Sequence, residues 1–212
     1  YKIITAVAEN INDIDMQLGH LKEIQLIRER RRMDELEYLF KHALTQETAY
    51  NSLLIQQRRE IHLHVARAIE QLFSERLQEF YGMLAWHYNL GDNSDKTEYY
   101  LIKAGEESLK ASASSEAVYF YKQALGLYRK KYGERANPEK IAMLEKNIGI
   151  ALFNKGLYEE CIEYMDRSLA YYGEHIPHHP VAMFRKTVRD LLLLILRLYV
   201  PTFRWKYKPT DN

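Results

Sequence analysis

Cysteine, proline and glycine are all scarce in this chain of 212 residues, and each shortage excludes a class of protein. The single cysteine, Cys161, excludes an intrachain disulfide and is typical of a reducing compartment, so we expect a cytoplasmic location. Five prolines and nine glycines, beside 47% hydrophobic residues, exclude a disordered chain. The net charge of +1 argues against a general attraction to nucleic acid or to an anionic membrane.

Motifs that carry chemistry are also missing. None of the nine glycines belongs to a Gly-x-x-x-x-Gly-Lys-Ser/Thr phosphate loop, and no Ser or Cys stands in a recognisable nucleophile context. His62 and His64 are two residues apart on a predicted helix and therefore point to different faces. His175, His178 and His179 have no cysteine or acidic pair beside them. We therefore predict no catalytic residue, no cofactor and no metal in this chain.

Long apolar runs are absent except for residues 191–200, LLLLILRLYV. This run is about half of the ~20 apolar residues that a spanning helix needs, and Arg197 interrupts it. We do not expect membrane contact, although a helix lying on a membrane surface is the alternative. The segment 176–212 is expected to cap the fold or to form a homodimer interface with Leu192, Ile195, Arg204 and Trp205.

The first part of the chain, residues 1–44, changes its period. Residues 1–8 and 13–24 have helical spacing, whereas 24–31 and 35–40 alternate apolar and polar residues. The order of helix, helix and β-hairpin at about 24–40 is typical of a winged-helix unit. We expect the ring of Phe40 to fill the gap between the hairpin and the helices.

Two connecting helices are predicted over residues 45–75. Thr45 is a candidate N-cap for the first, which would carry Tyr50, Leu53 and Leu54 inward. In the second, an apolar stripe is predicted at the helical spacings of four, four and three residues. Its members are Ile61, Val65, Ile69 and Leu72.

Residues 76–175 show only helical patterns and repeated small residues. Helices are predicted at 76–90, 95–110, 115–131, 138–155 and 158–172, with a last one at 180–200. Ser114 and Asn137 are candidate caps, and Pro138 suits a first helical position. Small residues and turn residues recur at the spacing of tetratricopeptide repeats, in divergent and overlapping copies. These residues are Ala85, Gly105, Ala117, Ala124, Gly149, Gly156, Tyr158 and Cys161. The predicted fold is therefore all-α, a tetratricopeptide-like solenoid preceded by a partial winged-helix unit with a small β-hairpin.

Three stretches together carry a family resemblance: Y-L-F-K-H-A-L-T-Q-E from Tyr38, R-R-E-I-H-L-H-V-A from Arg58, and L-A-W-H-Y from Leu84. In this order they resemble the C-terminal region of the STAND-type ATPase module attached to many class III adenylate and guanylate cyclases. The resemblance spans nearly the whole chain. It implies a non-catalytic regulatory arm of a multidomain signalling protein whose partners are the upstream ATPase and cyclase domains.

The same resemblance gives a role to the corner between hairpin and helices, where Phe40, His42, Tyr50, Arg58 and His62 would transmit movement. A structural role for His42, bonding a buried carbonyl, is the simpler alternative. Other open hypotheses are a freestanding adaptor that binds a peptide and a part of an ATP-dependent transcription regulator. DNA binding by the RERRR stretch is not expected, because acidic residues surround it and the preceding helix is acidic.

Overall fold

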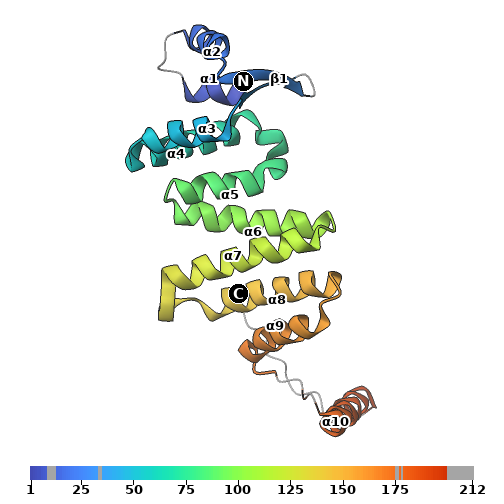
Figure 1. Ribbon diagram of the computed structural model, residues 1–212. Helices are drawn as coiled ribbons and strands as arrows, with labels where there is room; N and C mark the ends of the chain where they lie inside the picture. Colours follow the sequence, from blue (N-terminus) through green and yellow to red (C-terminus); the bar gives the residue numbers. More distant parts are fainter. Residues whose placement is uncertain (9–12, 33–34, 175–176, 178, 200–212) are drawn as a thin grey trace.

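The computed structural model describes residues 1–8, 13–32, 35–174, 177 and 179–199. These residues form ten α-helices, two short 3-10 helices and one antiparallel pair of strands, which confirms the predicted all-α class with a small hairpin. Figure 1 shows the helices stacked one on the next as a ladder that runs from the N-terminal unit to α9.

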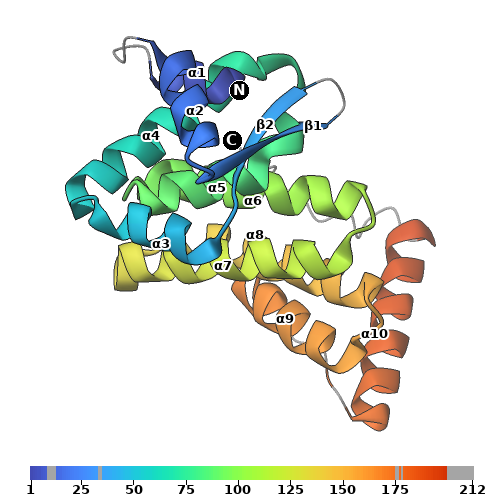
Figure 2. The same cartoon turned by 45° about the horizontal axis from the view of Figure 1, so that its top comes forward.

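The N-terminal unit contains α1 (Lys2–Val7), α2 (Ile14–Glu23), β1 (Ile27–Arg32) and β2 (Glu35–Phe40). This confirms the predicted order of helix, helix and hairpin, and Figure 2 shows the unit gathered at one end of the ladder. In the hairpin Ile27 pairs with Phe40, and Arg30 bonds the Glu37 carboxylate at 2.6 Å. The strand begins later than predicted because Gln25 adopts a left-handed conformation (φ 63°) that ends α2.

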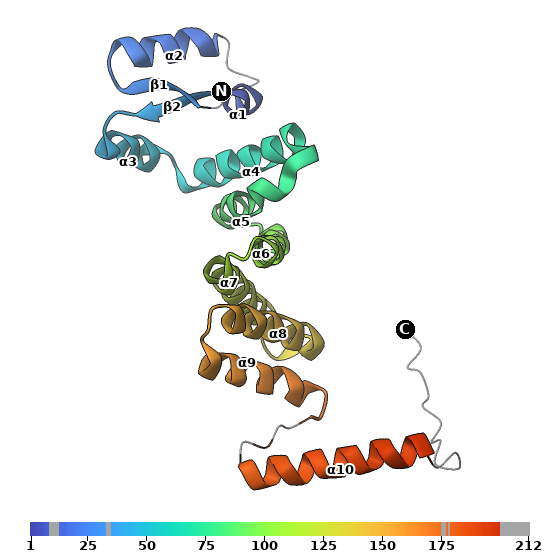
Figure 3. The ribbon, with the colours of Figure 1, turned by 90° about the vertical axis from the view of Figure 1, so that its right-hand side faces the viewer.

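The remaining helices follow in sequence as antiparallel neighbours. From α5 to α8 each helix packs against the helices before and after it, and α9 packs against α8. In Figure 3 α5 and α7 lie on one side of the ladder with α6 and α8 on the other. Their bounds are α3 (Ala43–Ser52), α4 (Ile55–Leu72), η1 (Ser74–Phe80), α5 (Tyr81–Leu90), α6 (Ser94–Lys110), α7 (Ser114–Tyr132), η2 (Gly133–Arg135), α8 (Pro138–Asn154), α9 (Tyr158–Tyr171) and α10 (Pro180–Tyr199).

The pairs α6–α7 and α8–α9 are copies of one another, displaced by 44 residues. Gly105 lies against the ring of Tyr121, where an added Cβ would stand 2.8 Å from the ring, and Gly149 lies in the same way against Met165, at 2.9 Å. Small residues are needed here because the helices cross at close range. The period exceeds the usual 34 residues of a tetratricopeptide because α7 is long and η2 is inserted after it.

The turns of the two copies match as well. Ser112 and Gly156, which are 44 residues apart, both have positive φ (59° and 80°). In each turn the next residue bonds back to the helix, Ala113 N–H to the Ser108 carbonyl at 2.8 Å and Leu157 N–H to the Leu152 carbonyl at 3.0 Å. This is the Schellman ending, which satisfies carbonyls that the helix leaves open.

The small residues predicted for repeat packing lie at the helix interfaces. Ala85, Ala117, Ala124 and Cys161 are buried in the core. Tyr158 begins α9 just after the turn at Gly156, and its ring contacts Phe153 with 5.6 Å between centroids instead of entering the core. The core therefore rests on small residues in the helix middles and on large rings such as Tyr121, which is fully buried.

Ion pairs connect alternate helices along one side of the ladder. Lys96 Nζ lies 2.8 Å from the Glu70 carboxylate and joins α6 to α4, and Lys140 pairs with Glu98 and joins α8 to α6. We call the layer of α4, α6 and α8 that these two pairs connect the spine. Its spacing is fixed by charge as well as by packing.

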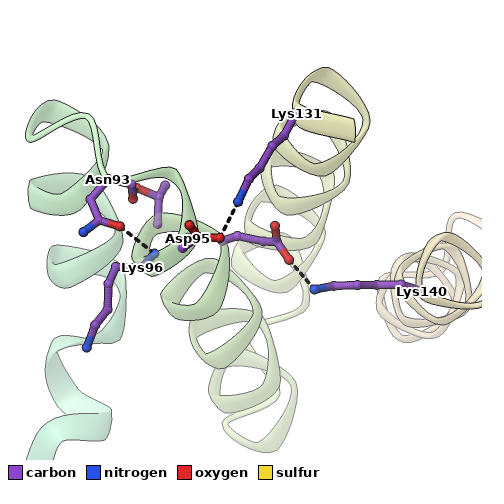
Figure 4. A network of polar contacts seen from close by, with 7 residues as sticks. Asn93, Asp95, Lys96, Lys131 and Lys140 are labelled. Atoms are coloured by element: carbon purple, nitrogen blue, oxygen red, sulfur yellow. Dashed lines mark hydrogen bonds and ion pairs between the residues drawn. The ribbon is translucent and has the colours of Figure 1, made fainter. Parts of the chain in front are cut away.

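Figure 4 shows the start of α6, where this network is densest. The side chain of Asn93 accepts the backbone N–H of Lys96 at 3.0 Å and caps the helix, while Asp95 pairs with Lys131 of α7. The same device begins α8, where Asn137 accepts the N–H of Glu139 at 2.9 Å, as the sequence predicted.

Three predicted helix starts were wrong. The N-cap position of α3 is His42 and not Thr45, and that of α7 is Ala113, so Ser114 is its first helical residue. Residues 76–80 belong to a 3-10 segment instead of to α5, because Arg76 has non-helical angles (φ −132°, ψ 36°). In each case a local propensity gave way to the path that the chain takes between packed helices.

The predicted inward faces of α3 and α4 were also partly wrong. Four residues that were predicted to point inward are exposed, namely Tyr50, Leu54, Ile61 and Leu72, whereas His62 and Ile69 are buried. The buried stripe of α4 is rotated because His62 finds polar partners inside the fold, which a count of apolar residues does not register.

Helix α10 stands apart from α9 in Figures 1 and 3, with Leu192 and Ile195 exposed on it. Arg204 and Trp205, predicted beside them at an interface, lie outside the described residues. Over the described part of the chain no helix combines the length and the apolar character that crossing a bilayer requires.

Candidate interaction groove

The corner between the N-terminal unit and the ladder holds a chain of hydrogen bonds. The hydroxyl of Tyr50 on α3 lies 3.0 Å from His62 Nε2 on α4, and His62 Nδ1 lies 2.9 Å from Nδ1 of His87 on α5. The contact between the two ring nitrogens needs one N–H and one lone pair, so at least one of the two imidazoles is neutral. These two hydrogen bonds therefore join α3, α4 and α5 through their side chains.

Electrostatics keep the two imidazoles neutral. Burial lowers the pKa of His62, and burial together with the neighbouring His62 lowers the pKa of His87 to about 4. Arg58 stands 4.8 Å from the Tyr50 ring centroid and donates to the carbonyls of Leu53 (3.0 Å) and Asn51 (2.8 Å), so it closes the turn between α3 and α4. The guanidinium thus organises the backbone of the corner.

The structure brings together three of the five residues predicted for this corner. Tyr50, Arg58 and His62 form one cluster, whereas His42 is exposed, which argues against its predicted role of bonding a buried carbonyl. Phe40 is exposed rather than filling a gap, because it lines an open groove beside α3. The hydrogen-bonded partner that the sequence analysis missed is His87.

Two grooves open on the side of the ladder that carries α3, α5 and α7. The α3 groove, of about 780 Å³, lies between the end of β2, α3 and α5. The α7 groove, of about 500 Å³, lies over α6 between α5 and α7. The lining residues of the α3 groove are Phe40, Ala43, Gln46, Glu47, Ala49, Tyr50, Leu53, Trp86 and Leu90.

Trp86 belongs to both grooves and separates them. Its ring stands edge-on to His62 (5.2 Å between centroids) and to His87 (4.8 Å), so the corner cluster holds it in place. Even so, 55% of its surface is exposed. The Trp86 ring is held by His62 and His87 on one side and is exposed to solvent on the other. A partner that packs on it would therefore lose little side-chain conformational entropy.

The two grooves differ in charge. The α7 groove presents the aromatic rings of Tyr119 and Phe120 beside Lys122 and Lys130, with no acidic residue in its lining. Glu160 of α9 lies 3.7 Å from Lys122 and balances part of its charge, and Lys130 adds a further positive charge to the lining. The α7 groove therefore suits apolar groups that are accompanied by negative charge.

The sequence analysis did not single out Trp86. One signal was available in the stretch L-A-W-H-Y. Leu84, Ala85 and Tyr88 occupy its buried positions, so the large aromatic residue between them points outward. An outward Trp on a repeat helix is the feature that could have been noticed.

The described residues contain no group of three or more His, Cys, Asp or Glu side chains arranged to hold a metal ion. The imidazoles of His62 and His87 contact each other through their Nδ1 atoms, and Nε2 of His62 contacts the Tyr50 hydroxyl. The corner cluster is therefore a polar joint between helices.

Comparison with known protein families gives no match for this chain. A stretch of 90 residues, 42% of the chain, is 36% identical to an uncharacterized protein of Rhizobium meliloti (strain 1021). The match covers 9% of that protein, which is therefore about 1,000 residues long. The chain is thus similar to a small part of a much larger protein.

Proposed function

We propose that this chain is a non-catalytic interaction module whose α3 and α7 grooves hold a segment of a protein partner. One observation carries the proposal: Trp86, half exposed and fixed by two imidazoles, joins two open grooves lined by apolar and aromatic side chains. Exposed rings anchored in this way are the usual centres of binding energy in protein interfaces.

The chemistry of the partner follows from the lining. The α7 groove offers Lys122 and Lys130 next to aromatic rings, and the α3 groove offers a mostly apolar wall that also contains Gln46 and Glu47. The acidic side chains of the partner are therefore expected at the α7 groove and its apolar side chains at the α3 groove. The segment that fits both combines apolar side chains with acidic ones, with an apolar group packed on Trp86. Screening by salt would weaken the charged half of the contact and leave the apolar half intact.

In a larger protein the module would act as a regulatory arm. The STAND-type ATPase of a nucleotidyl cyclase remains our proposed parent, supported by the order of hairpin unit, corner and helical repeats and by the three sequence stretches described above. The size of the Rhizobium relative supports a multidomain setting. Occupation of the α3 groove would then be felt at the corner and at the N-terminal unit. Tyr50 lines this groove and bonds His62 of the corner, and Trp86 lines the groove and packs on the corner.

The test is to select binding peptides from a random displayed peptide library. The immobilised target is the chain with Trp205→Phe, in which Trp86 is the remaining tryptophan. We expect the selected peptides to be rich in Asp, Glu and apolar residues. Trp86→Ala should weaken their binding by about 30-fold, which corresponds to a central residue worth about 2 kcal/mol.

The matched control is Tyr99→Ala, which removes another half-exposed ring that lies on α6 outside both groove linings. Equal loss in both variants, or selected peptides without acidic residues, would contradict the proposal. Calorimetric titration with ATP and with cyclic nucleotides should give no binding heat, and a saturable heat would refute a purely protein-binding role.

A further inference from the structure

The outer face of α9 is open at positions whose counterparts in α7 are covered. Val118 of α7 is 9% exposed, and its counterpart 44 residues later, Ile162 of α9, is 49% exposed. Tyr128 is 6% exposed, and its counterpart Tyr172 is 62% exposed. The two helices therefore carry the same apolar surface with a different degree of cover.

The start of α8 provides the cover on α7. The backbone N–H of Asn137 donates to the Tyr128 hydroxyl at 3.1 Å, and Lys140 Nζ lies 4.8 Å from the Tyr128 ring centroid. Among the residues that the structure describes, no helix takes this place over Tyr172. The repeat thus predicts one further helix against α9, in the position that α8 has against α7.

The next helix of the chain has the required pattern. Of the seven buried residues of α8, Ala142, Glu145 and Gly149 correspond to Lys186, Arg189 and Leu193 of α10, 44 positions later. The other four, Leu144, Ile148, Ala151 and Leu152, correspond to Val188, Leu192, Ile195 and Leu196. All four are apolar, and they fall on one stripe of the helix. At present Val188, Leu192, Ile195 and Leu196 are exposed to solvent.

Charge points to the same pairing. Helix α9 has four acidic residues and one basic residue, a net charge of −3, whereas α10 has four basic residues and one acidic residue, a net charge of +3. An ion pair already ties α10 to the connection that follows α9, since Lys186 Nζ of α10 lies 3.4 Å from the Glu174 carboxylate. Two copies of α10 would repel each other, while α9 attracts it.

We propose that the outer face of α9 is a docking surface for α10 of the same chain, and that the chain has a closed arrangement in which α10 covers α9 as α8 covers α7. Residues 172–179 connect the two helices, and they are longer than the connection 133–137 that lets α8 pack on α7. In the closed arrangement Phe184, the counterpart of Lys140, covers the Tyr172 ring.

The register also makes α10 a terminal helix. Leu193 stands where α8 has Gly149, the residue that lets Met165 of α9 approach closely. A helix that followed α10 could not approach in that way, because the leucine fills the space. In the closed arrangement α10 is therefore the last helix of this repeat packing. The outer face of α9 would be covered by α10 of the same chain, whereas the α3 and α7 grooves stay open for a partner.

The test is hydrogen exchange of the whole chain, with Leu192→Glu as the variant and Leu194→Glu as the matched control. The two leucines have nearly equal exposure, 54% and 53%, but Leu194 is the counterpart of Ile150, which faces outward from α8. We expect the amides of α9 to exchange at least tenfold faster in Leu192→Glu and at an unchanged rate in Leu194→Glu. Unchanged protection of α5 to α8 in both variants shows that the fold is intact.

Sedimentation at several concentrations separates the possible occupants. The closed arrangement predicts a monomer whose α9 protection does not depend on concentration. Protection that grows with concentration would assign the surface to a second copy and overturn the proposal. An α9 that exchanges in the wild-type chain as fast as in Leu192→Glu would overturn it as well.

Discussion

Replacing glycine by alanine should have opposite effects at two helical positions of this fold. Gly126 of α7 has no atom within 4 Å of an added Cβ, whereas at Gly105 of α6 the added Cβ would stand 2.8 to 2.9 Å from three carbons of the Tyr121 ring. Both residues lie inside helices, so both substitutions improve helix propensity equally. The difference between them isolates the cost of the crossing between α6 and α7.

The propensity gain is about 1 kcal/mol for glycine to alanine in a helix interior, so Gly126→Ala should raise the free energy of unfolding by about that amount. At Gly105 an overpacking cost of about 1–3 kcal/mol opposes it. Tyr121 is rigid and fully buried, so the cost falls in the upper part of this range. We expect a net destabilisation of about 1–2 kcal/mol, and a difference of about 2–3 kcal/mol between the two variants.

Gly149→Ala provides an intermediate case. The neighbouring atoms belong to Met165, a flexible side chain that can move aside, so the overpacking cost should nearly cancel the propensity gain. Urea unfolding followed by two independent probes gives the three free energies. Gly105→Ala as stable as Gly126→Ala would refute the view that the Gly105 contact sets the helix crossing.

Three further changes test other features. Ser112→Gly relieves a positive φ of 59° at an exposed turn and should raise the unfolding free energy by about 0.5–1 kcal/mol in urea; a loss would contradict the strain. Because the pKa of His87 is about 4 in the fold and near 6.5 when unfolded, stability should fall as the pH drops from 6.5 towards 4, and His87→Gln should flatten this slope in melting curves. The buried Glu145 carboxylate lies 2.8 Å from Arg129 and 3.5 Å from Arg167, so replacing both arginines by alanine should cost about 3–5 kcal/mol, more than the two single losses together, in a double-mutant cycle.

Features that depend on local chemistry could be predicted from the sequence. The strand Glu35–Phe40 follows from its alternation, and the start of α8 follows from Asn137 and Pro138, because a cap and a proline act on their own backbone. The small residues at Gly105 and Gly149 were found because close helix crossings leave no other choice of side chain.

Features that depend on distant partners could not be predicted. The burial of His62 requires the ring of His87, 25 residues away, and no local pattern connects the two. The groove at Trp86 requires α3, α5 and α7 to lie side by side, which only the stacking of the ladder decides. The 44-residue period escaped notice because equivalent positions in the two copies, such as Ala117 and Cys161, are similar in size but differ in identity.

The ion pairs of the spine give the ladder a preferred direction of bending. Lys96 with Glu70 and Lys140 with Glu98 link α4 to α6 and α6 to α8, while on the opposite side open grooves lie between α3 and α5 and between α5 and α7. Widening or narrowing of the grooves should therefore meet less resistance than stretching of the spine, so the ladder should bend mainly about the spine. A partner bound beside Trp86 would widen the grooves and tilt the N-terminal hairpin relative to α7, and salt, which screens the ion pairs of the spine, would reduce this directional preference.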